Sequence, residues 1–154
     1  MAKFMKLLNN ISRSQAVFRR EKISPNELLP SQHAYALAIC REPGRTQEEI
    51  ASELCINKST AARSLNALEE KGYIERLPLA QDKRCFSVYP TEKLLSLLPK
   101  IRAASKEWME LLSAGIPEDE LEIFNSVLEK MEARAKAAIE KQDNAGAMGD
   151  MLAK

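Results

Sequence analysis

The chain has 154 residues, of which 45% are hydrophobic and 29% charged, and its formal net charge is +1. These values are typical of one folded domain with a real core, or of two small lobes sharing one, and they exclude a disordered chain. No apolar run approaches the ~20 residues that cross a bilayer, and the first residues lack a signal-peptide pattern, so we expect a cytoplasmic protein.

Few residues in the chain are suited to metal binding or catalysis. Cys40, Cys55 and Cys85 are widely spaced and odd in number, which is a poor disulfide framework, and His33 is the only histidine. One histidine leaves too few ligands for structural zinc and little capacity for acid–base catalysis. The sequence also has no Ser-His-Asp set, carboxylate pair or glycine-rich phosphate loop. We therefore expect no metal, no cofactor and no enzyme activity.

Two helices are predicted in the first quarter of the chain. Residues 3–21 carry apolar side chains at helical spacing, as expected for an amphipathic helix. A second helix is expected from about Ser31, after Pro30, to about Arg41.

A helix-turn-helix is predicted next. Thr46 and Glu49 have the spacing of a capping box, which opens a short third helix. Residues 55–57 make a tight turn, and Asn57 caps a fourth helix over 58–71. Two helices joined by so short a turn are typical of DNA-binding proteins, in which the second helix enters the major groove.

The fourth helix has one apolar and one polar face. Ala61, Leu65 and Leu68 share the apolar side by their spacing. The other side presents groups that hydrogen-bond base edges without bulk, and a lysine suited to phosphate. The candidate DNA-binding residues on this helix are Lys58, which would contact phosphate, and Ser59, Thr60, Arg63 and Asn66, which would contact bases. The alternative is a surface helix whose polar face is only solvated.

A β-hairpin is predicted after Gly72, which suits the left-handed C-cap of the fourth helix. Its polar loop, residues 80–84, contains Asp82, Lys83 and Arg84. A guanidinium suits a narrow, negative minor groove, so Arg84 is the expected contact, with Asp82 fixing its rotamer and Lys83 adding charge. The alternative is an ordinary turn with two solvated bases.

Helices return after residue 91. A heptad seam is predicted on the last one, and a seam of this kind calls for a partner helix unless it packs within its own chain. Its members are Leu121, Phe124, Leu128, Met131, Ala135 and Ala138. The predicted organisation is a dimerisation helix in 1–30, a winged helix-turn-helix in 31–91, dimerisation helices in 92–142 and a flexible tail in 143–154.

The sequence resembles the MarR family of bacterial transcription regulators. The resemblance rests on the stretch TQEEIASELCINKSTAARSLNALEEKGYIERLPLAQDKRCFSVYPT, with Asp82-x-Arg84 in register with the helix-turn-helix. It implies a mainly α fold with a small β-hairpin wing, and a helical dimerisation region formed by the terminal helices. It also implies a homodimer on a pseudo-palindromic operator, with Arg84 in the minor groove. Most members are repressors, released by a small aromatic or phenolic acid or by cysteine oxidation.

The sequence leaves the control mechanism and one alternative function open. Cys85, beside two basic residues, is the best redox candidate, although a structural role is the simpler alternative. Cys40 and Cys55 are expected to be packing residues. Effector-pocket candidates are the residues Arg19, Arg20, His33, Tyr35 and Trp108, from which no site is assigned. The alternative function is a winged-helix adaptor that binds protein and not DNA.

Overall fold

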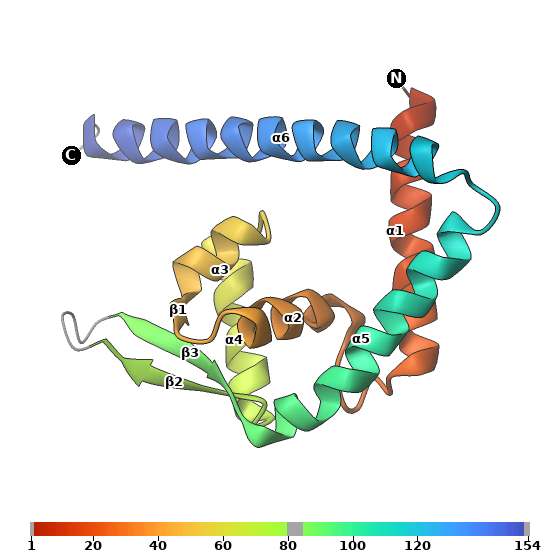
Figure 1. The fold of residues 1–154 in the computed structure, drawn as a ribbon. Coiled ribbons are helices and arrows are strands. Elements are labelled where there is room, and N and C mark those ends of the chain that lie inside the picture. The colour runs from red at the N-terminus through yellow and green to blue at the C-terminus, as the bar shows by residue number, and fades with distance from the viewer. Residues whose placement is uncertain (1, 80–84, 153–154) are drawn as a thin grey trace. The chain divides into compact units, whose positions relative to one another are not determined.

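The computed structural model describes residues 2–79 and 85–152, with side chains described within these ranges from 3 to 139. The fold is mainly helical with one small antiparallel sheet (Figure 1). The helices are α1 (Ala2–Lys22), η1 (Pro30–Gln32), α2 (His33–Arg41), α3 (Gln47–Glu53), α4 (Lys58–Glu70), α5 (Glu92–Ser113) and α6 (Glu118–Leu152). The strands are β1 (Arg45–Thr46), β2 (Ile74–Pro78) and β3 (Phe86–Pro90). The predicted winged helix-turn-helix is confirmed: α3 and α4 precede the β2–β3 hairpin.

The sheet contains a third strand that the sequence did not predict. Its order is β1-β3-β2, and the two residues of β1 pair with the middle of β3, Arg45 opposite Val88. Gly44 leads into β1, and its N–H donates to the Val88 carbonyl at 2.8 Å. Gly44 has a φ of +91, and a Cβ there would lie 3.0 Å from the Tyr89 hydroxyl. Glycine therefore allows the chain to approach β3 closely enough to form β1.

The predicted caps of the helix-turn-helix are confirmed. The Thr46 N–H donates to the Glu49 carboxylate at 2.7 Å, and the Thr46 hydroxyl accepts the Glu49 N–H at 3.3 Å. At the start of α4, the Asn57 side chain accepts the Thr60 N–H at 2.8 Å. At its end, Gly72 has a φ of +72, the left-handed conformation that glycine adopts without a Cβ clash. Side-chain caps thus satisfy N–H groups at the first turn of both helices.

The two cysteines expected to pack differ in the structure. Cys40 is half-buried against the core, and burial raises the pKa of its thiol more than the Arg102 charge lowers it. Cys55 is exposed, so the prediction that it is a packing residue is wrong. It occupies the turn between α3 and α4 with a φ of +53, a left-handed conformation that is unusual for a residue with a Cβ. The turn geometry, and not packing, places this side chain.

One hydrophobic core underlies residues 1–112, which form a compact unit. The inner face of α4 is confirmed, since Ala61, Leu65 and Leu68 are fully buried. The first half of α5 enters the same core through Leu94, Leu97 and Ile101, and its Leu98 and Ala104 are also buried. The start of α5 therefore shares its core with the helix-turn-helix, although the predicted boundary after residue 91 assigned it to the next segment. The assignment of segments to dimerisation and DNA binding stays a prediction.

Aromatic and ionic contacts join α1 to α5 within this unit. The ring centroids of Phe18 and Trp108 lie 5.2 Å apart. The Lys22 ammonium lies 5.1 Å from the Phe18 ring centroid and 2.6 Å from a Glu107 carboxylate oxygen. Trp108, an effector-pocket candidate, is thus half-buried between these two helices.

Residues 113–154 form a second compact unit, dominated by α6. The predicted heptad seam lies on this helix, where Leu121 and Leu128 are half-exposed and Phe124 and Met131 are exposed. The helix extends to Leu152, through most of the segment predicted to be a flexible tail; flexibility there stays a prediction. In the part of the chain that the structure describes, no helix has both the length and the apolarity needed to cross a bilayer.

Candidate nucleic-acid interface

The predicted DNA-binding residues of α4 share the face opposite its buried side. Ser59, Arg63 and Asn66 are exposed and Thr60 is half-exposed. The helix presents these four side chains to solvent because Leu65 and its apolar neighbours fix the other face against the core. A helix anchored on one side and polar on the other can enter a groove without unfolding its own domain.

Hydrogen bonds preorganise the N-terminal end of α4. Asn57 Oδ1 accepts from the Ser59 hydroxyl at 2.9 Å as well as from the Thr60 N–H. One turn on, the Arg63 guanidinium donates to the Thr60 hydroxyl at 3.3 Å. The N-terminus of a helix carries partial positive charge, which favours an approaching phosphate. These contacts hold the polar groups at the end of the helix that would enter the groove first.

Lys58, the predicted phosphate contact, lies near an acid that sequence reasoning missed. Its ammonium is 2.7 Å from a carboxylate oxygen of Glu48 on α3, and the two side chains are 76% and 70% exposed. Exposed ion pairs contribute only ~0–1 kcal/mol, so a DNA phosphate can compete for this lysine. Counting the charges along α4 alone could not reveal this partner of Lys58, because Glu48 lies on α3.

Asn66 is held by a neighbour that sequence reasoning also missed. Arg76 on β2 donates a short hydrogen bond from Nη2 to Asn66 Oδ1. The same guanidinium donates to a single Glu69 oxygen from Nε at 3.0 Å and from Nη2 at 2.6 Å. The three side chains tie the middle of α4 to the wing strand β2.

The wing residues Asp82, Lys83 and Arg84 lie outside the described residues, and their roles stay predictions. The strands that lead to the loop are described: Pro78 pairs with Phe86, and the Leu79 N–H donates to the Cys85 carbonyl at 2.9 Å. This register keeps the hairpin paired as far as Leu79 and Cys85, and β2 contacts α4. Cys85 is exposed at the base of the loop.

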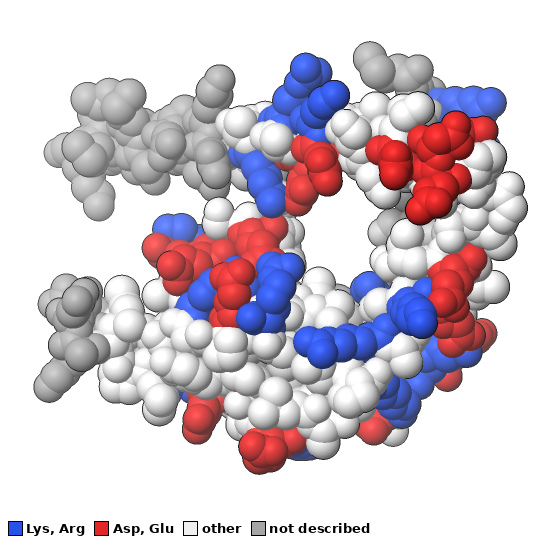
Figure 2. All heavy atoms as spheres, in the orientation of Figure 1, with Lys and Arg blue, Asp and Glu red and all other residues white. Residues whose placement is uncertain are grey.

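The surface carries charges of both signs. Basic and acidic side chains lie interspersed on the face shown in Figure 2, as the formal net charge of +1 leads one to expect. Because the charges are mixed, DNA binding would depend on the placement of a few groups on α4 and the wing more than on bulk attraction.

Among the described residues, no group of three His, Cys, Asp or Glu side chains is placed to hold a metal ion.

An ionic cluster braces α3, the helix that supports α4. Glu53 accepts short hydrogen bonds from Arg41 and Arg45, and Arg45 also donates to the Ala38 carbonyl at 2.8 Å. Burial alone would raise the pKa of Glu53, but the hydrogen bonds and charges of the two arginines outweigh it and lower the pKa below its ordinary value of 4.5. A carboxyl whose pKa is lowered by folding stabilises the fold when it is ionised.

We predict that this cluster makes stability fall in acid. The contribution of Glu53 is fully present above the ordinary pKa of 4.5, and is lost as the pH falls through the lowered pKa of the folded state. Glu53→Gln should lower the free energy of unfolding at pH 7 by roughly 1 kcal/mol and reduce its acid dependence. Urea unfolding of both proteins at neutral pH and near pH 4 measures this. Equal pH dependence in the two proteins would exclude Glu53 as its source.

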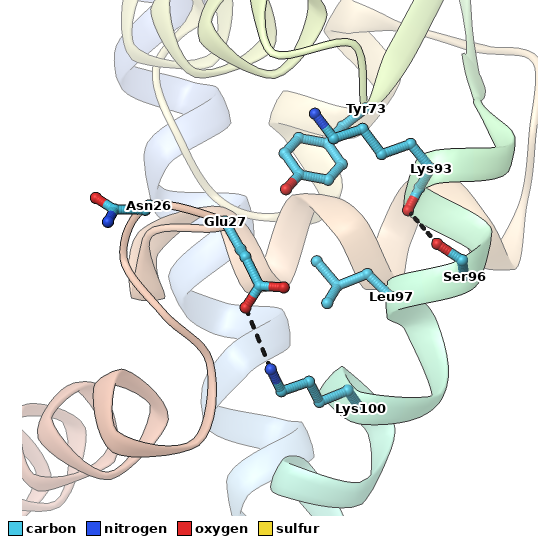
Figure 3. A pocket seen from close by; sticks show the side chains of 7 residues that line it. All are labelled: Asn26, Glu27, Tyr73, Lys93, Ser96, Leu97 and Lys100. Carbon is cyan, nitrogen blue, oxygen red and sulfur yellow. Dashed lines mark hydrogen bonds and ion pairs between the residues drawn. The ribbon is translucent and has the colours of Figure 1, made fainter.

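A cleft of about 540 Å³ lies between the first half of α5, the loop that follows α1, and Tyr73 just before β2 (Figure 3). It is lined by Asn26, Glu27, Tyr73, Lys93, Ser96, Leu97 and Lys100. The Lys93 ammonium lies 4.5 Å from the Tyr73 ring centroid and donates to the Lys71 carbonyl, the C-cap of α4, at 2.6 Å. Lys100 pairs with Glu27 at 3.2 Å. Both lysines are thus used within the protein, and Lys93 connects the end of α4 to α5.

Among the predicted effector-pocket residues, His33 and Tyr35 are buried and Arg19 is half-buried with a buried Nε. His33 is fully buried, and its ring nitrogens make no hydrogen bond of good geometry to a described residue, the nearest candidate partner being the Leu28 backbone. Burial, and then the charge of Arg19, lower the pKa of His33 to about 4, while hydrogen bonding with the Leu28 backbone acts in the opposite direction. Burial also lowers the pKa of Arg19, whose Nε likewise has no partner among the described residues. At pH 7 the pair therefore consists of a neutral imidazole near a guanidinium.

Comparisons with known proteins agree with this geometry. The family model described as MarR family matches residues 26–84. An uncharacterized HTH-type transcriptional regulator of Bacillus subtilis (strain 168), YybA, is 30% identical over 105 residues, which is 68% of this chain and 70% of that protein.

Solved structures show the same fold over most of the chain. A MarR transcriptional regulator from Methanosarcina mazei Go1 has a TM-score of 0.79 and 29% identity, covering 89% of this chain and 99% of that one. A crystal structure of MarR has a TM-score of 0.74 and 33% identity, covering 85% and 89%. The chain belongs to the MarR family of winged helix-turn-helix transcriptional regulators, a family of regulators and not of enzymes.

Proposed function

We propose that this chain is a homodimeric, sequence-specific DNA-binding protein that represses transcription from a pseudo-palindromic operator. The observation that carries the proposal is the face of α4, on which three exposed and one half-exposed hydrogen-bonding side chains lie opposite a fully buried apolar face. Ser59, Thr60, Arg63 and Asn66 contact bases in the major groove, and Lys58 contacts phosphate. In the wing, Arg84 enters the minor groove, oriented by Asp82 and supported by Lys83. A protein with this function works where the chromosome is, so the proposal includes the cytoplasm.

Exposed apolar side chains on the terminal helices support the homodimer. Large apolar residues are exposed on α1, α5 and α6: Phe4, Leu7, Leu8, Ile11, Met109, Leu111, Leu112, Ile123, Phe124, Val127 and Met131. Each Å² of this apolar surface that a partner covers would contribute ~25 cal/mol to the free energy of association. The segments 1–30 and 92–142 are the proposed dimerisation regions, with 31–91 reading DNA and 143–154 as a tail.

Salt-dependent binding to duplex DNA tests the function directly. Because the surface charges are mixed, we expect binding to weaken between ~50 and ~200 mM salt with fewer than about eight counterions released. Lys58→Ala should reduce the salt slope by about one. Lys106→Ala removes a lysine of α5 that is 3.7 Å from Glu110, and serves as the matched control without effect. Fluorescence anisotropy measures all three proteins.

The second candidate function is a protein-binding adaptor, and the same salt titration distinguishes it from a DNA-binding regulator. An adaptor that uses the winged helix only as a scaffold would show no salt-sensitive duplex binding. A slope as steep as eight to ten released ions would instead contradict the modest electrostatics proposed here.

We further propose that a small aromatic or phenolic acid releases the protein from DNA by binding at Arg19 and His33. Buried polar groups without partners are costly, at about 1–3 kcal/mol each, and a carboxylate ligand would satisfy the guanidinium. In a panel of benzoic and hydroxybenzoic acids, at least one should weaken duplex binding by the wild type. Arg19→Gln should abolish that response and keep the basal affinity. A response in the variant equal to that of the wild type would rule out this site.

Control by cysteine oxidation is the alternative mechanism, and Cys85 is its candidate. Its exposure beside the wing makes it accessible to oxidants. Peroxide should then weaken duplex binding by the wild type and have no effect on Cys85→Ser. If the substituted protein is as sensitive as the wild type, this cysteine is not a sensor.

A further inference from the structure

The hydrogen bond between Arg76 and Asn66 determines which end of the Asn66 amide is available to a partner. A guanidinium carries only donors, so the amide atom that faces it must be the oxygen. Arg76 Nη2 donates to Asn66 Oδ1 in this way. The oxygen is therefore turned toward the wing strand, and the amide nitrogen, with its two N–H donors, is the end left for a partner.

Arg76 is itself held in place, so the amide cannot easily reverse. The Arg76 side chain is only 20% exposed, and its Nε and Nη2 both donate to Glu69 Oε2. Its backbone lies in the centre of the β2–β3 ladder, opposite Val88. Turning the Asn66 nitrogen inward would place donors against donors and leave a largely buried guanidinium with one partner fewer.

We infer that Asn66 is a donor-only specificity residue, oriented by Arg76, and that the base it contacts is guanine. Guanine presents two acceptors, N7 and O6, in the major groove. Adenine is the usual partner of asparagine, but that pairing needs the amide oxygen beside the nitrogen to accept from N6. Here Arg76 holds the oxygen toward the wing strand, so the nitrogen and the oxygen do not face one base edge together. The inference rests on the proposed DNA-binding function and makes Arg76 a positioning residue for it.

Selection of duplexes from a random pool, repeated with variants, tests the inference. The position contacted by Asn66 is defined as the one whose base preference is lost in Asn66→Ala. At that position the wild type should prefer guanine over adenine by about tenfold. Asn66→Asp still pairs with Arg76 but turns an acceptor outward, so it should change the preference to cytosine, whose N4 donates.

Variants of Arg76 test its positioning role. Arg76→Met removes the donor and frees the amide, so adenine should rise to at least the level of guanine. Arg76→Lys keeps a donor and should retain guanine. Thermal unfolding identifies variants that fail to fold. If Arg76→Met fails to fold, Asn66→Asp still tests the inference, because the aspartate keeps the hydrogen bond with Arg76.

Each outcome decides between the possibilities. Three results would overturn the inference while the proposed function stands. The wild type could prefer adenine at the position that Asn66→Ala defines, Asn66→Ala could define no such position, or a folded Arg76→Met could keep the wild-type preference. If the wild type enriches no sequence, both fail together.

Discussion

Arg63→Ala should weaken binding to the operator by ~1–3 kcal/mol, or about 5- to 150-fold, and relax the base preference at one position in each half-site. Arg63 is exposed on the N-terminal half of α4, where its guanidinium is oriented by the Thr60 hydroxyl at 3.3 Å. An oriented guanidinium donates two parallel hydrogen bonds to a guanine edge, the commonest specific contact between protein and DNA. Dissociation constants for the operator and for random duplex measure the effect.

The comparison between the two duplexes shows what Arg63 contacts. A base contact predicts a large loss on the operator and a small loss on random duplex. An equal loss on both would mean that Arg63 touches only phosphate. Arg102→Ala, which removes an exposed arginine from α5, is the control and should change neither affinity.

The double substitution Phe124→Glu with Met131→Glu should convert the dimer to a monomer and reduce operator affinity ~10²- to 10⁴-fold. Both residues belong to the α6 seam, and Phe124 is 52% exposed in the single chain. Carboxylates in a seam packed against a partner would be buried without counter-charges, which is costly. A monomer binds one half-site and loses the gain from binding the second on the same duplex.

Sedimentation velocity gives the oligomeric state, and anisotropy on the operator gives the affinity. Asn125→Glu adds one such carboxylate to α6 at an exposed position outside the seam, and should leave both unchanged. A double variant that remains dimeric would remove α6 from the interface. A wild type that is monomeric at operator-binding concentrations would refute the homodimer.

The predictable parts of the fold are those that local chemistry decides. Thr46 with Glu49, Asn57 and Gly72 act within one turn of the backbone, so the bounds of α3 and α4 followed from the sequence. The buried face of α4 followed in the same way, because the helical period alone places Leu65 and its apolar neighbours on one side.

The unpredicted parts depend on contacts between distant segments. The strand β1 has two residues, too few for an alternating pattern, and it exists because Gly44 lets the chain approach Tyr89. The pairing of Lys58 with Glu48 and of Asn66 with Arg76 spans ten residues and two elements in each case. Sequence reasoning identified the polar face of α4 but not the neighbours that orient its side chains.

The exposed turn at Cys55 shows the same limit. A cysteine at a helix end is more often buried, and residue type alone predicted packing. The tight turn between α3 and α4 instead imposes a left-handed backbone that directs the side chain to solvent. Turn geometry here overrode the preference of the residue.

Selection of bound duplexes from a random pool by the purified wild-type protein, at near-physiological salt, tests the proposed function most directly. A dimer that reads DNA with α4 predicts an inverted repeat whose half-sites are about one helical turn apart. A single unrepeated site would contradict the dimeric reader, and no enrichment at all would contradict sequence-specific DNA binding by the unliganded protein.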